Sequence, residues 1–313
     1  MMSRMKTRRI GSLEVSIVGL GCNNFGGRLD AEATAAVVNA ALDAGITLFD
    51  TADVYGGTQS EVMLGHALGA RREQIVLATK FGMAVPGEPG GASPAYVQRA
   101  VEASLRRLGT DRIDLYQLHR PDPKVPIADT LGALDALVKA GKVREIGCSN
   151  FSVTQLHEAA AAVAPGGAAF ASVQNELSLL HREAEADVLP ECAHTNLAFL
   201  PYFPLASGML TGKYRGAGAT TARGRLASGG KQADTYRSPA NAALVDALAA
   251  FAEQHEHTLL ELAVGWLLAH PPVSSVIAGA MTAEQVRANV AAASWQLADE
   301  PDALAELERL VRG

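Results

Sequence analysis

Four side chains of this 313-residue chain have the types needed to move a proton onto an oxygen: Asp50, Tyr55, Lys80 and His119. A tyrosine hydroxyl has an unperturbed pKa near 10 and is a poor acid at neutral pH. Because a neighbouring ammonium stabilises tyrosinate, we expect Lys80 to lower the pKa of Tyr55. A carboxylate at Asp50 would keep that ammonium charged and oriented, and His119 would hydrogen-bond the same substrate oxygen.

This set of groups indicates proton donation to a carbonyl oxygen as it becomes an alkoxide. It includes no strong nucleophile, and the sequence shows no cluster of metal ligands, so we expect no metal. Another species must deliver the reducing equivalent, which points to a nicotinamide. Taken singly, each residue also has a structural interpretation: a turn or cap for the aspartate, a solvated charge for the lysine, and packing for the two rings.

The elements that must position these groups alternate along the chain. Short apolar or β-branched segments between turn residues predict eight strands, at 18–21, 46–49, 75–79, 113–118, 143–148, 170–174, 197–201 and 275–278. Helical patterns between them include those from Asp30 to Gly45, from Ser93 to Gly109 and from Ile127 to Gly141. This alternation predicts a parallel (β/α)8 TIM barrel as a single domain over residues 1–313.

Two further elements are expected outside the barrel repeat. The segment TRRIGSLEVSIVG at 7–19 predicts a small hairpin that plugs the bottom of the barrel, and 301–312 predicts an added C-terminal helix. The Gly-, Ser- and Arg-rich segment 214–238 follows the seventh strand, so we expect it to overhang the opposite, active rim.

Catalytic groups in a parallel barrel gather at the carboxyl ends of the strands. Asp50, Lys80 and His119 each come at the end of a predicted strand, and Tyr55 follows in the loop after Asp50. The later strands also end in polar or small residues: Ser149 with Asn150, Gln174 with Asn175, Tyr202, and Gly279 with Ala280. Their joint placement on one rim favours the functional interpretation over the structural one.

At these residues the sequence resembles the aldo-keto reductase superfamily. The motifs that carry the resemblance are LGCNNFGG (20–27), FDTADVYGGTQSEVMLG (49–65), KFG (80–82), IDLYQLHRPDP (113–123), GKVREIGCSNF (141–151), SVQNELSLL (172–180), PYFPLASGMLTGKY (201–214) and VIAGAMTAEQVRANV (276–290). The resemblance implies reversible reduction of an aldehyde or ketone by direct hydride transfer from a nicotinamide. It makes Asp50, Tyr55, Lys80 and His119 the catalytic tetrad, with Tyr55 as proton donor.

The resemblance also implies a site for NADP(H), with NAD(H) as an alternative. Ser149, Asn150 and Gln174 match positions that hold the carboxamide, and Tyr202 matches the aromatic residue that stacks on the nicotinamide. The positions matched for the rest of the nucleotide are Gly21, Asn24, Asp50, Pro204, Leu205, Ser207, Gly208, Lys213, Gly279, Thr282, Gln285 and Asn289. From the residues alone, Thr282 and Gln285 predict a capping box at a helix N-terminus, which offers N–H groups to phosphate.

Three positions depart from the family pattern. Met281 stands where relatives often carry a cation against the 2′-phosphate, and Arg287 is the candidate to compensate. Phe203 replaces a common serine, and Leu177 replaces a common tyrosine. Gly19 and Gly21 hint at a dinucleotide fingerprint, but the complete GxGxxG spacing is absent.

Composition bounds the remaining possibilities. The net charge of −6 disfavours nucleic acid as a partner. Three widely spaced cysteines (Cys22, Cys148, Cys192) indicate buried reduced thiols, and the basic N-terminus lacks an apolar segment, so we expect a cytoplasmic protein. The apolar stretch 258–270 contains Glu261 and predicts a buried helix rather than a membrane span.

Two other functions compete with carbonyl reduction. One is a nucleotide-sensing regulatory subunit with little turnover. The other is a Schiff-base lyase or aldolase with Lys80 as nucleophile, which needs an unprotonated lysine that a paired Asp50 would disfavour. The substrate class within small carbonyl compounds stays open, as does the choice between a monomer and a small homo-oligomer; we expect the loops 22–29, 83–92, 120–125 and 214–238 to set specificity.

Overall fold

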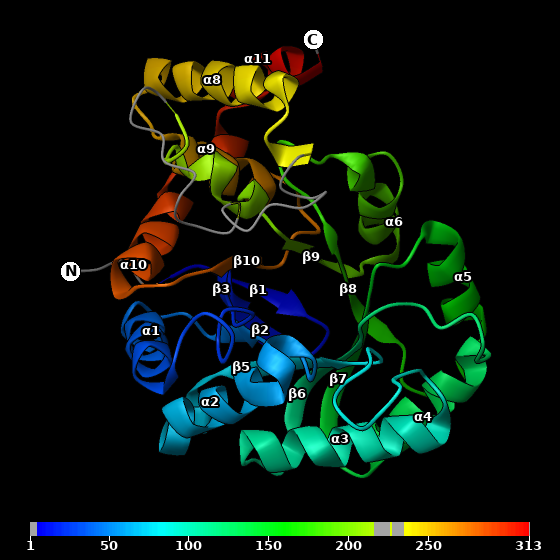
Figure 1. Cartoon of the computed structure of the whole chain (residues 1–313). Helices are drawn as coiled ribbons and strands as arrows, with labels where there is room; N and C mark the ends of the chain where they lie inside the picture. The colour runs from blue at the N-terminus through cyan, green and yellow to red at the C-terminus, as the bar shows by residue number, and fades with distance from the viewer. Residues whose placement is uncertain (1–4, 216–225, 227–234, 313) are drawn as a thin grey trace.

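Eight parallel strands form a closed barrel in the computed structural model, which describes residues 5–215, 226 and 235–312 (Figure 1). In spatial order they are β10 (Val276–Gly279), β3 (Val18–Gly21), β4 (Leu48–Asp50), β5 (Val76–Phe81), β6 (Ile113–Leu118), β7 (Val143–Ser149), β8 (Phe170–Glu176) and β9 (Ala198–Tyr202). The ring closes where Phe199 N donates to Pro272 O at 2.8 Å and Ser274 N donates to Phe199 O at 3.0 Å. The predicted (β/α)8 barrel is confirmed, with strand ends within two residues of those expected.

Helices surround the barrel on its outer side (Figure 1). Their bounds are α1 (Ala31–Asp43), α2 (Gln59–Leu68), α3 (Pro94–Leu108), α4 (Ile127–Lys139), α5 (Val153–Ala161), α6 (Val188–Thr195), α8 (Pro239–Gln254), α9 (Leu259–Ala269), α10 (Ala283–Ala291) and α11 (Pro301–Arg312). At several of these helices the structure confirms the first or last residue predicted from the sequence. Asp30 caps α1 by accepting from Ala33 N, and Ser93 caps α3, which ends at Gly109 in the left-handed conformation.

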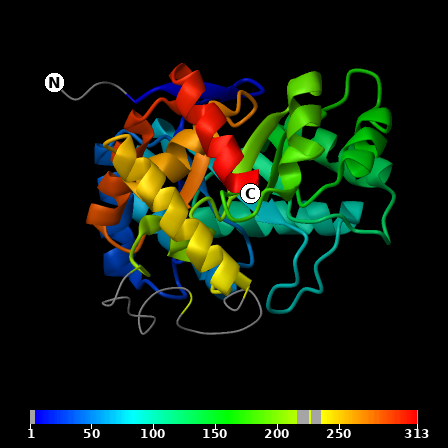
Figure 2. The same cartoon turned by 90° about the horizontal axis from the view of Figure 1, so that it is seen from above.

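An antiparallel hairpin covers the amino-terminal end of the barrel (Figure 2). It consists of β1 (Thr7–Ile10) and β2 (Leu13–Ser16). Ile10, Leu13 and Val15 are fully or almost fully buried in one cluster with inward-facing barrel residues such as Leu48 and Leu115. The hairpin therefore closes the bottom of the core, as predicted, and leaves the carboxyl-terminal mouth for chemistry.

The interior of the barrel changes character along its axis because alternate strand residues point inward. Apolar side chains such as Leu48, Ala78 and Leu115 fill the lower layer. Two residues further along the same strands come Asp50, Lys80 and Gln117, all buried. Strand periodicity thus places a polar layer directly on top of an apolar one, at the carboxyl ends of the strands.

Other sequence expectations are also met in the described chain. The three cysteines are buried free thiols. The stretch 258–270 forms the largely buried helix α9, and residues 301–312 form α11. Among the described residues, no helix combines the length and apolar character needed to cross a bilayer. Most of segment 214–238 lies outside the described residues, and with it the expectation that this segment overhangs the rim.

Candidate active site

The centre of the polar layer is a buried ion pair between neighbouring barrel strands. Lys80 Nζ lies 2.6 Å from Asp50 Oδ2 and donates to Thr51 O at 2.9 Å. Lys80 is 0 % exposed. Although burial alone would lower the pKa of Lys80, the charges and hydrogen bonds of Asp50 and Tyr55 raise it above the usual value. Lys80 is therefore an ammonium, which disfavours its use as a Schiff-base nucleophile.

Tyr55 opens a short 3-10 turn, η1 (Tyr55–Thr58), in the loop after β4. Its hydroxyl lies 3.5 Å from Lys80 Nζ, and the same nitrogen lies 5.1 Å from the centre of the ring. The turn is seated tightly on the loop after β3, because Gly56 has φ of +57° and a Cβ there would stand 2.5 Å from Phe25 O. This packing fixes the turn that carries the phenol.

The protonation of Tyr55 differs from the expectation. Burial raises the pKa of Tyr55 above its ordinary value of 10.0, and the Lys80 ammonium acts in the opposite direction without reversing the shift. The expected net lowering is wrong because it counted the charge of Lys80 and left out desolvation and the opposing charge of Asp50. The resting residue is thus a neutral phenol that holds a proton.

His119 stands beside Tyr55 at the end of β6. The two rings meet edge to face with centroids 5.9 Å apart. Burial, together with the charges of Lys80 and Arg120, lowers the pKa of His119 to about 3. The imidazole is therefore neutral at physiological pH and offers one N–H donor. His119 N donates to Phe81 O, which ties this loop to β5.

Two glutamines complete the shell around Asp50. Gln117 Nε2 and Gln174 Nε2 each donate to Asp50 Oδ1 at 3.1 Å, so both carboxylate oxygens have strong partners. Gln174 was expected to contact a nucleotide carboxamide, whereas Gln117 was not assigned a role. The sequence did contain a signal for Gln117. It comes two residues before His119, near the end of β6, and alternate residues of a strand turn their side chains to the same side.

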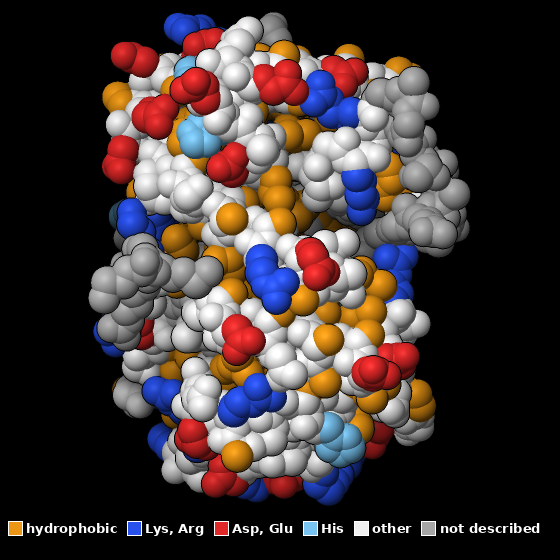
Figure 3. All heavy atoms as spheres, turned by 90° about the vertical axis from the view of Figure 1, so that its left-hand side faces the viewer, with side chains coloured by type: hydrophobic (Ala, Val, Ile, Leu, Met, Phe, Trp, Pro, Cys, Tyr) orange, Lys and Arg blue, Asp and Glu red, His pale blue; other side chains and the backbone are white. Residues whose placement is uncertain are grey.

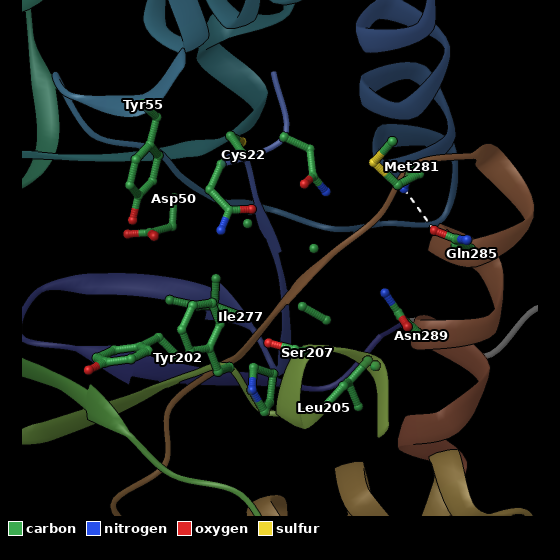
Figure 4. A pocket seen from close by; sticks show the side chains of 18 of the residues that line it. Cys22, Asp50, Tyr55, Tyr202, Leu205, Ser207, Ile277, Met281, Gln285 and Asn289 are labelled. Atoms are coloured by element: carbon green, nitrogen blue, oxygen red, sulfur yellow. Dashed lines mark hydrogen bonds between the residues drawn. The ribbon is translucent and has the colours of Figure 1, made fainter. Parts of the chain in front are cut away.

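A cavity of about 1140 Å³ opens at the carboxyl ends of the strands. Figure 4 shows Tyr55 and Asp50 at one end of it, and Gln285 and Asn289 of α10 at the other. Every residue predicted for catalysis or nucleotide binding lines this cavity except Lys80, Thr282 and the candidate cation Arg287. Lys80 lies behind Asp50 and Tyr55, and Thr282 is the N-cap of α10. This space exceeds that of a typical site for a single small molecule.

The rim next to Tyr55 is organised by one asparagine. Asn150 has φ of +62°, and its amide nitrogen donates to His119 O and to Ser149 Oγ, both at 3.0 Å. Its amide oxygen accepts from the hydroxyl of Tyr202 at 2.8 Å. Ser149 Oγ in turn donates to Gln174 O. The hydrogen bonds therefore fix the ring of Tyr202 against the wall of the cavity.

The segment after β9 has an unusual backbone. Phe203, Ala206 and Ser207 all have positive φ, a strained conformation for residues other than glycine. Ser207 lines the cavity, and its Oγ is buried without a hydrogen-bond partner among the described residues. Lys213 also lines this part and lies against the ring of Tyr214. A buried orphan hydroxyl next to a cation suits an anionic ligand oxygen.

The far end of the cavity is the N-terminus of α10. Thr282 caps the helix by accepting from Gln285 N at 3.3 Å, as predicted. The other half of the expected capping box is wrong: Gln285 Oε1 accepts from Met281 N at 2.8 Å instead of from Thr282 N (Figure 4). Arg287 does not line the cavity, and its exposed side chain lies 3.8 Å from Glu284.

Several residues that line the cavity were not assigned to the site from the sequence. Arg28, Arg120 and Ile277 line the cavity, the first two from loops that were expected to set specificity. The loop 83–92 was also expected to set specificity, but none of its residues lines this cavity. Val85, Pro86 and Glu88 line a second cavity of about 650 Å³ together with Asp53.

On the face of the molecule drawn in Figure 3, acidic and basic side chains are interspersed.

Comparisons with known proteins agree with this geometry. The model of the Aldo/keto reductase family matches residues 17–309. A probable aldo-keto reductase 1 of Glycine max is 35% identical over 295 residues, covering 92% of this chain and 83% of that protein. The aldo-keto reductase YhdN of Bacillus subtilis (strain 168) is 36% identical over 300 residues, covering 92% and 88%.

A solved structure is also similar over nearly the whole length. The glycerol dehydrogenase of Gluconobacter oxydans superposes with a TM-score of 0.84 at 32% sequence identity, covering 97% of this chain and 94% of that one. The barrel, the hairpin below it and the sequence matches agree with one another, and the chain belongs to the aldo/keto reductase family of oxidoreductases.

Proposed function

We propose that this oxidoreductase reduces an aldehyde or ketone to an alcohol with NADP(H), with Tyr55 as the proton donor. One observation carries the proposal: the Tyr55 hydroxyl lies 3.5 Å from a buried lysine ammonium, beside a neutral imidazole, at one end of a cavity of about 1140 Å³ whose lining extends to Gln285 and Asn289 of α10. A phenol in these surroundings is protonated at rest, and its anion is stabilised once the proton has left.

The cavity lining fits a nicotinamide dinucleotide. Tyr202 offers a ring face held by Asn150, and the buried orphan Oγ of Ser207 with Lys213 suits a pyrophosphate. The N-terminus of α10 provides N–H groups for the phosphate at the adenosine end. When bound, the reduced nicotinamide supplies a hydride to the carbonyl carbon.

The chain's own groups handle the carbonyl oxygen. Tyr55 OH and an N–H of His119 bind this oxygen and orient the carbonyl. As negative charge develops there, Tyr55 donates its proton and the Lys80 ammonium stabilises the resulting tyrosinate. Asp50, held by Gln117 and Gln174, keeps Lys80 in place. In alcohol oxidation the tyrosinate takes the proton back.

The preference for NADP(H) over NAD(H) rests on charge. Lys213 suits the pyrophosphate that both nucleotides share, so Arg28 is the lining cation left for a 2′-phosphate, and Met281 offers no charge to that group. We expect NADPH to have the lower KM, and Met281→Arg to widen that difference, because an arginine binds phosphate oxygens in a fork. A lower KM for NADH in the unsubstituted protein would contradict this part.

A reduction screen tests the proposed function as a whole. The purified protein is assayed with NADPH and with NADH against short aldehydes, aromatic aldehydes and ketones, and in the reverse direction against alcohols. Glycerol belongs in the panel because a structural relative is a glycerol dehydrogenase. Turnover of carbonyl compounds that depends on the nucleotide supports the proposal. Tight nucleotide binding without turnover of any substrate would instead favour a nucleotide sensor.

A further inference from the structure

The catalytic cavity is more basic than the chain that forms it. The chain carries 27 Lys and Arg against 33 Asp and Glu. Among the described residues, the lining of the cavity nevertheless includes three cations, Arg28, Arg120 and Lys213, against one carboxylate, Asp50. That carboxylate is already bound to Lys80. The cavity therefore presents positive charge to whatever enters it.

Arg120 lies at the substrate end of this cavity. It follows His119 directly in the chain, and its charge acts on both His119 and Tyr202. These two rings flank the place where the carbonyl must sit. Figure 4 shows Tyr55, whose ring meets that of His119, at the opposite end of the cavity from Gln285 and Asn289 of α10, the helix whose N-terminus suits a nucleotide phosphate.

The guanidinium of Arg120 has no partner among residues 5–215, 226 and 235–312. Within the described parts of the chain, it makes no hydrogen bond and no ion pair, and the residue is exposed. Arg72, Arg107 and Arg182 are, by contrast, each paired with a carboxylate within 2.8 Å. Glu176, whose charge also acts on Tyr202, accepts from the hydroxyl of Tyr236 and does not line the cavity.

We propose that Arg120 determines substrate specificity by binding an anionic oxygen group, a carboxylate or a phosphate, of the carbonyl substrate. This inference rests on the proposed function. A guanidinium binds such groups through two parallel hydrogen bonds, which adds direction to the attraction of charge. The side chain is free to make them. The preferred substrate is then a short aldehyde or ketone with an acidic group at its other end.

Matched substrate pairs test this inference at pH 7.5. The first pair is 4-oxobutanoate and butanal, and the second is glyceraldehyde 3-phosphate and glyceraldehyde. We expect the unsubstituted enzyme to favour at least one anionic member by about 10- to 100-fold in kcat/KM, mainly through KM. The pair with the larger ratio identifies the acidic group. In Arg120→Gln the ratio should fall below about 3-fold, and in Arg120→Lys it should be intermediate.

Lys124 provides the matched control. It carries the same charge in the same loop but does not line the cavity. Lys124→Gln should therefore keep the preference, which separates direct binding from a general field effect. Since burial and Lys80 still act on His119 in Arg120→Gln, we expect the imidazole to stay neutral at the assay pH. Ionic strength gives a second measurement on the unsubstituted enzyme: 0.5 M salt should weaken the preference.

The possible outcomes are distinct. Reduction of butanal and glyceraldehyde without preference for either anionic partner would overturn the role of Arg120 and leave carbonyl reduction standing. An equal preference in the unsubstituted enzyme and Arg120→Gln would also overturn it. Failure to reduce any aldehyde with either nucleotide would instead contradict the proposed function.

Discussion

The ammonium of Lys80 lies 3.5 Å from the hydroxyl of Tyr55, and both belong to a site that is sealed from below by the apolar layer of the barrel. Lys80 binds Asp50 at 2.6 Å on its other side. One buried cation therefore serves two acidic groups, a carboxylate that holds it and a phenol that it can stabilise as an anion. This arrangement links the stability of the barrel mouth to its chemistry.

The Asp50–Lys80 pair permits a test that separates stability from chemistry. Lys80→Met should destabilise the protein by about 3–5 kcal/mol, because it leaves a buried carboxylate without its cation. The double variant Asp50→Asn with Lys80→Met should recover most of this stability, as no buried charge remains. Urea unfolding measures the effect. Carbonyl reduction should stay low in both variants, and its return in the double variant would contradict a role for the ammonium.

His119 should not titrate in the physiological range. Because its folded pKa is about 3 and the ordinary value is 6.5, the unfolded chain binds more protons between these values. The contribution of His119 to stability therefore rises with pH from about 3 to 6.5 and is constant above. NMR of the imidazole should show no change of protonation between pH 5 and 8. A midpoint near 6.5 would refute the neutral-donor role.

Asp53, two residues before Tyr55, should make the protein less stable at higher pH. Burial and the charge of Glu61 raise the pKa of Asp53 from 3.8 to about 7. The folded state then binds more protons than the unfolded state between these values, so stability falls as pH rises from about 4 to 7. Asp53→Asn should raise Tm at pH 8 by an amount equivalent to about 2–4 kcal/mol. At pH 4 the difference between the two proteins should be much smaller, and a constant difference at both pH values would contradict the assignment.

Two adjacent glycines test how tightly the turn that carries Tyr55 is held. Gly56 and Gly57 both have positive φ, so alanine at either should cost about 1 kcal/mol of backbone strain. Only at Gly56 does the new Cβ meet the backbone, 2.5 Å from Phe25 O, whereas nothing lies within 4 Å at Gly57. Gly56→Ala should therefore lose about 1–3 kcal/mol more and also lower kcat. Equal losses in the two variants would show that the turn moves freely.

Much of this architecture could be predicted from the sequence because its signals are local. Strand and helix periods, the caps at Asp30 and Ser93, and the left-handed Gly109 each depend on a few neighbouring residues. The positions of Asp50, Lys80 and His119 follow from one rule, that catalytic groups gather where parallel strands end. The barrel and the placement of these three residues at its mouth could therefore be predicted from local patterns, whereas the nucleotide-site residues were inferred from the family resemblance and Arg28, Arg120 and Ile277 of the lining were not assigned to the site.

Other features depend on distances in space that no local pattern contains. The net pKa of Tyr55 is decided by how much water the fold removes, which opposes the charge of Lys80. Gln117 acquires its role only when the strands are in register, so that its amide reaches Asp50. Gln285 bonds to Met281 rather than to Thr282, a choice of side-chain rotamer that the capping motif leaves open.

The most direct test of the central claim is the substitution Tyr55→Phe, which removes one hydroxyl and keeps the ring. Steady-state reduction of the best aldehyde from the screen is measured together with nucleotide binding, followed by fluorescence. If Tyr55 donates the proton, kcat should fall by about 10²- to 10⁴-fold while the nucleotide binds as before. Turnover within a few-fold of the unsubstituted enzyme, with nucleotide binding intact, would contradict the role of Tyr55.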